Sequence, residues 1–63
     1  MKVREILKLL DKDGWRQVRQ KGSHRQLQHD SKPGTVTVAG KSNDDINPKT
    51  LKSILRQAGL PQK

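Results

Sequence analysis

The chain has 63 residues, enough for one small domain that we expect to span residues 1–63. It carries 14 lysine and arginine residues against 6 aspartate and glutamate residues, a formal net charge of +8, and no cysteine. A chain this short buries only about 60% of its surface on folding, which excludes a large substrate-enclosing cleft, and the lack of cysteine excludes disulfides and thiolate metal sites.

The first predicted element is a helix over residues 2–12. Apolar residues recur there at three- and four-residue spacing and form one stripe: Val3, Ile6, Leu7 and Leu10. Gly14 is expected to end this helix, because glycine readily adopts the left-handed backbone of a helix terminus. Charges interrupt the apolar residues, unlike in a signal peptide or a membrane span, so we expect a soluble, cytoplasmic protein.

Three antiparallel strands are predicted next, over residues 14–21, 24–29 and 35–39. Glycine-containing turns separate them, at Gly22 and at residues 30–34. Side chains of the middle strand alternate between two faces, of which Leu27 marks the buried one. On this pattern Leu27 shares its face with Arg25 and His29, and the opposite face carries His24, Gln26 and Gln28.

A second helix is predicted to follow a polar loop at residues 40–45. Asn47 can cap exposed backbone amides, and Pro48 suits the first helical position. Gly59 is expected to end this helix in the left-handed conformation. Its apolar stripe comprises Leu51, Ile54, Leu55 and Ala58.

The predicted fold class is therefore α+β, in the order helix, three antiparallel strands, helix. Two amphipathic helices can cover one face of such a sheet and leave the other to solvent or RNA. This α-β-β-β-α order is the layout of double-stranded-RNA-binding domains, although a shared layout does not by itself give a function.

Positive charge runs along the whole chain and favours polyanionic partners, RNA or DNA first, because phosphate contacts supply most non-specific affinity. One alternative is that the charge only aids solubility. An anionic membrane surface is less favoured, since a lipid-bound helix needs a broad aromatic or leucine face and Trp15 is the only aromatic residue.

The Gly-Ser-His tripeptide at residues 22–24 is the strongest candidate for chemistry, because basic residues surround it in the sequence. An imidazole exchanges protons near neutral pH, so His24 could take the proton of a ribose 2′-hydroxyl and direct that oxygen at the adjacent phosphate without a metal. Nearby cations would stabilise charge on the phosphoryl oxygens. On these residues alone, an ordinary surface histidine is the commoner interpretation.

Four segments of the chain resemble the HicA family, the mRNA-interferase toxins of HicA–HicB toxin–antitoxin pairs. They are LLDKDGW at residues 9–15, RQKGSH at 19–24, KPGTVTV at 32–38 and TLKSILRQAGL at 50–60. The match covers nearly the whole chain in order, and the combination of the Gly-Ser-His motif with the closing helix is specific to this family.

The resemblance implies a metal-independent endoribonuclease without a cofactor, with His24 as the catalytic residue and Gly22 and Ser23 as its supporting turn. It also implies silencing by a HicB-type antitoxin, whose acidic domain would cover the histidine and the basic surface, and a chain of charge +8 offers the complementary charge. Two positions depart from the family pattern: Leu27 replaces an aromatic residue, and Lys41 lies in a loop where relatives often have a second histidine. The residues expected to contact RNA are Arg19, Lys21, Arg25 and Lys41.

For the other candidate residues, a structural role is the favoured interpretation. His29 lies five positions along the strand from His24, which places the two imidazoles on opposite faces and disfavours a two-histidine site. The acids at residues 11 and 13 and at residues 44 and 45 lack a third ligand nearby, so no metal site is expected. Trp15 could stack on a base, but a chain this small needs it in the core.

The leading hypothesis is therefore a toxin ribonuclease that acts on mRNA. The first alternative is a non-catalytic double-stranded-RNA-binding module of the same fold. The second is a basic structural protein, such as a small ribosomal component.

Overall fold

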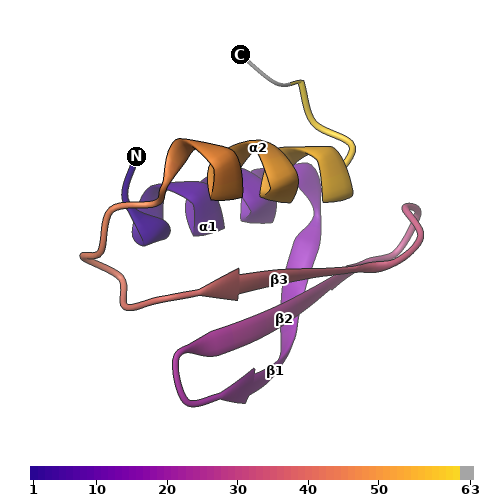
Figure 1. Ribbon diagram of the computed structural model, residues 1–63. Coiled ribbons are helices and arrows are strands. Elements are labelled where there is room, and N and C mark those ends of the chain that lie inside the picture. The colour runs from indigo at the N-terminus through magenta and orange to yellow at the C-terminus, as the bar shows by residue number, and fades with distance from the viewer. Residues whose placement is uncertain (62–63) are drawn as a thin grey trace.

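The computed structural model describes residues 1–61 and shows a helix, three strands and a second helix in chain order (Figure 1). The elements are α1 (Val3–Asp13), β1 (Trp15–Lys21), β2 (His24–His29), β3 (Thr35–Ala39) and α2 (Pro48–Gln57). The predicted α+β class and element order are confirmed. The first helix begins and ends one residue later than predicted, and β1 also begins one residue later.

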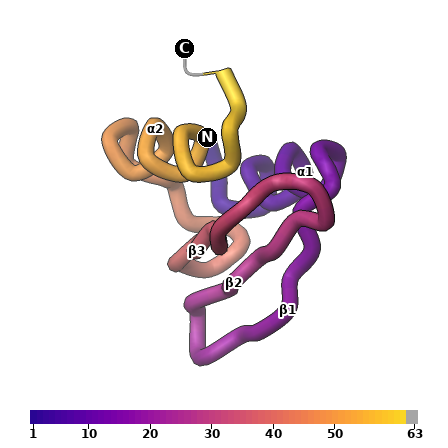
Figure 2. The backbone as a smooth tube through the Cα atoms, turned by 90° about the vertical axis from the view of Figure 1, so that its right-hand side faces the viewer, coloured from indigo at the N-terminus to yellow at the C-terminus, as the bar shows by residue number. Residues whose placement is uncertain are grey.

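The strands form one antiparallel sheet in the order β1-β2-β3. Both helices lie side by side on one face of this sheet, and none of residues 1–61 forms a layer on the other face (Figures 1 and 2). Trp15 is only 1% exposed between the layers, so its predicted core role is confirmed and its ring is not available for base stacking. The buried core comprises Val3, Ile6, Leu10, Trp15, Leu27, Val36, Val38, Ile54, Leu55 and Ala58.

Hydrogen bonds from neighbouring residues cap both ends of α2. The side-chain oxygen of Asn47 accepts a hydrogen bond from the backbone N–H of Lys49 at 2.9 Å, as the capping pattern predicts. At the other end Gly59 has a φ of +68°, and the N–H of Leu60 donates to the carbonyl of Leu55 at 2.9 Å. This is the hydrogen bonding of a Schellman motif, so both predicted helix ends are confirmed.

The start of α1 depends on a distant loop, because Lys2 supplies no capping side-chain hydrogen bond. The free N–H groups of Val3 and Arg4 donate instead to the carbonyls of Asp44 at 2.9 Å and Ser42 at 3.1 Å. Helix amides without an intrahelical acceptor need such partners. The loop after β3 is thereby fixed against the first turn of α1.

The first strand contains a bulge at Val18. Gln17 pairs with Leu27 and Arg19 pairs with the adjacent Gln26, so Val18 has no residue opposite it on β2. Val18 is also 54% exposed. An extra residue in one strand shifts its alternation of faces by one position, and this shift determines which side chains of β1 accompany His24.

Candidate active site

The sheet face away from the helices, called here the open face, carries side chains in rows. Residues directly opposite each other in an antiparallel sheet point to the same side, and on β2 and β3 these residues alternate with the buried Leu27, Val36 and Val38. In the order β1, β2, β3 the rows are Lys21, His24 and Ala39, then Arg19, Gln26 and Thr37, then Arg16, Gln28 and Thr35. The predicted division of β2 between two faces is confirmed.

A depression lies at the end of the open face that is nearest to the β1–β2 turn. Its lining mixes cations, an imidazole, an amide and a hydroxyl: Arg19, Lys21, His24, Gln26 and Thr37. The depression therefore offers hydrogen-bond donors, positive charge and one proton-exchanging ring in a single place.

His24 is the first residue of β2, directly after the turn, and it is exposed. Within residues 1–61 its side chain forms no hydrogen bond or ion pair. Both ring nitrogens can therefore meet a ligand without breaking an internal contact.

The turn before His24 depends on glycine for its backbone shape. Gly22 has a φ of +60°, and a Cβ built there would meet nothing within 4 Å, so conformation rather than crowding favours glycine. The carbonyl of Ser23 accepts a hydrogen bond from the N–H of Gly40 at 3.1 Å, which ties the turn to the end of β3. Gly22 and Ser23 thus hold the start of β2 in place.

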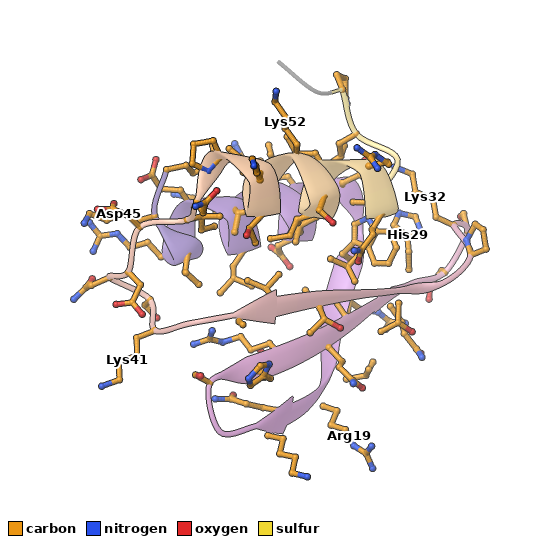
Figure 3. All side chains as sticks on the ribbon, viewed as in Figure 1. Arg19, His29, Lys32, Lys41, Asp45 and Lys52 are labelled. Atoms are coloured by element: carbon orange, nitrogen blue, oxygen red, sulfur yellow. The ribbon has the colours of Figure 1, made fainter. Side chains whose placement is uncertain are left out.

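The bulge at Val18 explains why Arg19 and Lys21 share the open face with His24. Counted from the inward-pointing Trp15, a regular strand would direct every odd-numbered residue of β1 towards the helices. The extra residue reverses this order, so Arg19 lies opposite Gln26 and Lys21 lies opposite His24. Figure 3 shows Arg19 on the side of the sheet that is remote from the helices. In the sequence this strand shows only an irregular alternation, which does not indicate where the shift falls.

Charge around His24 is positive because, among the described residues, no carboxylate lines the depression. Asp30 pairs with Arg16 at 2.6 Å, at the far end of the open face. Asp45 pairs with Lys2 at 3.6 Å, next to α1. Within residues 1–61, Arg19 and Lys21 form no ion pair, so both cations can bind an anionic ligand.

Arg25 and Lys41 are not brought into this depression. Arg25 lies on the helix-facing side of β2, half-buried, and its Nη1 donates to the carbonyl of Gly40 at 2.8 Å. Lys41 is exposed in the loop after β3, with its backbone N–H held by the carboxylate of Asp44 at 3.0 Å. Its side chain points away from the sheet into solvent (Figure 3). The open face thus gathers Arg19 and Lys21 around His24, with Lys41 at its margin.

His29 has a structural position, as the alternation of β2 predicts. Its Nε2 lies 2.6 Å from the carbonyl oxygen of Asp13, and its Nδ1 accepts from the N–H groups of Ser31 at 2.9 Å and Lys32 at 3.1 Å. The neutral ring protonated on Nε2 satisfies all three contacts. The edge-to-face contact with Trp15, at a centroid distance of 5.3 Å, fixes the ring further.

Lys32 joins the carboxyl ends of both helices beside His29 (Figure 3). Its Nζ bonds the carboxylate of Asp13 at 2.5 Å and the carbonyl of Ala58 at 3.0 Å. The hydrogen bond from Lys32 lowers the pKa of Asp13 below its ordinary value of 3.8. Partial burial raises this pKa, but the charge of Lys32 and a hydrogen bond from the indole N–H of Trp15 lower it further. The sequence does not show that residues 13, 32 and 58 meet, because they lie far apart in the chain.

The described residues also bear on metal binding and on membrane crossing. Among residues 1–61, no three histidine, aspartate or glutamate side chains gather closely enough to hold a metal ion. Neither of the helices described within these residues has the length and the apolar run that a membrane-spanning segment needs. A separate groove between the helices has a mostly aliphatic lining, without the polar groups that chemistry requires: Met1, Leu9, Leu51, Leu55, Leu60 and Pro61.

The comparisons with known proteins point to one family. Residues 3–60 match the family described as the HicA toxin of bacterial toxin–antitoxin systems. The matched range contains both helices, all three strands and the whole open-face depression. No curated protein matches the chain.

Proposed function

The chain belongs to the HicA toxin family of bacterial toxin–antitoxin systems, and from that premise we propose that it is an endoribonuclease that cuts mRNA with His24 as the general base. The observation that carries this proposal is the position of His24. It is an exposed imidazole without an internal partner in the described chain, and it lies beside two unpaired cations on the face that the helices leave open.

The reaction uses the RNA's own nucleophile and does not require a metal. The imidazole of His24 accepts the proton of a ribose 2′-hydroxyl, and the 2′-oxygen attacks the adjacent phosphorus. Arg19 and Lys21 neutralise charge that develops on the phosphoryl oxygens. The products are a 2′,3′-cyclic phosphate and a 5′-hydroxyl, and the predicted absence of a cofactor is part of this proposal.

Substrate binding on this surface is expected to follow the RNA backbone. The open face has cations, amides, hydroxyls and the imidazole of His24, but no phenylalanine, tyrosine or tryptophan among its described residues, so it lacks a broad platform on which bases could stack. Arg19 and Lys21 are the central phosphate contacts in this proposal, and Lys41 is a contact at the margin. The bond from Arg25 to Gly40 favours a positioning role for Arg25, which would hold the loop that carries Lys41.

We also propose a HicB-type antitoxin as the protein partner. The toxin–antitoxin family implies a partner of this kind in general. An acidic antitoxin domain seated on the open face would cover His24 and pair with the cations around it. Antitoxin and RNA would then compete for the same surface of the toxin in the cytoplasm, where mRNA is translated.

The test is cleavage of an RNA oligonucleotide by the purified protein in excess chelator. We expect wild-type cleavage with 2′,3′-cyclic phosphate ends, and a loss of about 10²- to 10⁴-fold for His24→Ala. Loss of cleavage in chelator, 3′-hydroxyl ends or full activity of His24→Ala would refute the mechanism. Binding without any cleavage by the wild type would favour the non-catalytic RNA-binding module instead. In cells, the wild type should arrest growth and His24→Ala should not.

A further inference from the structure

Cleavage by a 2′-oxygen needs a proton donor as well as a base. The oxygen that leaves phosphorus on the 5′ side is a strongly basic alkoxide unless it is protonated as the bond breaks. His29 is not available for this step, because it lies on the helix-facing side and its ring nitrogens bond Asp13, Ser31 and Lys32. Resting on the ribonuclease function proposed above, we propose that Lys21 is the general acid that protonates the leaving 5′-oxygen.

The composition of the depression favours Lys21 over its neighbours. A guanidinium does not release its proton in proteins, so Arg19 can supply charge but not acid catalysis. The amide of Gln26 and the hydroxyl of Thr37 can donate hydrogen bonds, but neither has a readily dissociable proton. No carboxyl group lines the depression. Once His24 acts as the base, the ammonium of Lys21 is the remaining acid among the lining side chains.

The position of Lys21 suits an in-line displacement. Lys21 and His24 are direct partners across the hairpin, with both side chains on the open face. Opposed residues of this kind have Cβ atoms about 5 Å apart, so a phosphate can lie between the two functional groups. The incoming 2′-oxygen and the leaving 5′-oxygen lie on opposite sides of phosphorus, and the long stem of Lys21 lets its ammonium reach the side away from the imidazole.

Two features of the fold maintain this pairing. The residues between the partners are Gly22 and Ser23, and the φ of +60° at Gly22 permits so short a connection. The bulge at Val18 allows Lys21 to face the substrate while Trp15, on the same strand, remains in the core. The hairpin therefore delivers a base and an acid from adjoining strands.

The step balances without a further reactant. His24 takes the 2′-hydroxyl proton and becomes an imidazolium as the bond between the 2′-oxygen and phosphorus forms. The bond between phosphorus and the 5′-oxygen breaks, its electron pair stays on that oxygen, and the ammonium of Lys21 supplies a proton to give the 5′-hydroxyl. His24 then returns a proton to water and Lys21 takes one from water, which restores both groups.

A sulfur substitution at the leaving atom tests this assignment. The substrates are two RNA oligonucleotides that differ only at the scissile linkage, one with the natural 5′-oxygen and one with a 5′-sulfur, which leaves as a thiolate without protonation. With the oxygen substrate, Lys21→Arg, which keeps the charge but not the dissociable proton, should lower kcat about 10²-fold or more with little change in KM. With the sulfur substrate, Lys21→Arg should be within about threefold of the wild type.

Two matched variants complete the experiment. His24→Ala should remain impaired on both substrates, because the 2′-hydroxyl still has to lose its proton. Lys52→Arg should match the wild type on both, since Lys52 points from α2 away from the sheet (Figure 3). Lys21 is exposed, so far-UV circular dichroism should confirm that its variant folds.

The outcomes separate this assignment from the ribonuclease proposal. Full activity of Lys21→Arg on the oxygen substrate would show that the charge alone matters, and an equal defect on both substrates would show that Lys21 acts only in binding. Either result overturns the assignment while the ribonuclease function stands. A wild type that cleaves neither substrate would instead refute the ribonuclease function, and the assignment with it.

Discussion

Substituting the two histidines of this chain should have different effects: His29→Ala should lower the stability of the fold, and His24→Ala should abolish RNA cleavage. The substitution removes three hydrogen bonds, to the carbonyl of Asp13 and from the N–H groups of Ser31 and Lys32. Each is worth about 1 kcal/mol net, so we expect a loss of about 2–3 kcal/mol, while a chain of this length has roughly 3–9 kcal/mol in total. At about 4–8 °C per kcal/mol, Tm should fall by roughly 10–20 °C.

The matched control is His24→Ala, which removes the same side chain from an exposed position without an internal partner in the described chain. Its free energy of unfolding should stay within about 0.5 kcal/mol of the wild type. Both variants are unfolded by urea and by heat, followed by far-UV circular dichroism. RNA cleavage is then measured at a temperature below both transitions, where His29→Ala should remain active and His24→Ala should not.

Two results would refute this reasoning. An unchanged Tm for His29→Ala would mean that its three contacts add nothing to the folded state. A large loss of stability in His24→Ala would mean that the open-face histidine has a structural contact, which would weaken its assignment as a free catalytic base.

Three further predictions test the surrounding residues. Because its interaction with Lys32 lowers the pKa of Asp13 below 3.8, the pair should stabilise the fold above about pH 4 and lose this effect as the pH falls further. The free energy of unfolding in urea, measured against pH, should therefore change less for Asp13→Asn than for the wild type. Parallel curves for the two proteins would contradict the pairing. Trp15→Phe loses the indole hydrogen bond to Asp13 and some buried volume, so its free energy of unfolding should fall by about 1–2 kcal/mol. The folded variant should still cut RNA normally. Loss of cleavage by the folded variant would instead indicate a direct contact with RNA. Arg19→Gln in a His24→Ala background should reduce the salt slope of RNA affinity by about 1, measured by fluorescence anisotropy, and an unchanged slope would remove Arg19 from the phosphate contacts.

Local patterns in the sequence determined most of the architecture. The spacing of apolar residues located both helices, and Asn47, Gly14 and Gly59 marked helix ends that the structure confirms. Alternation along β2 separated His24 from His29 and assigned Leu27 to the core. These features could be predicted because each depends on neighbours within a few residues, through caps, turns and the period of the strand.

The tertiary structure alone decided how the candidate site is completed. The bulge at Val18 lets Trp15 point into the core while Lys21 faces the other side of the sheet and pairs with His24 across a two-residue turn. A regular strand would place Trp15 and Lys21 on the same face. Contacts from Lys32 to Asp13 and Ala58 likewise join segments that are far apart in the chain. Local sequence could name the candidate residues, but which of them share the open face depends on packing between distant elements, because burial of the tryptophan sets the register that orients the cations.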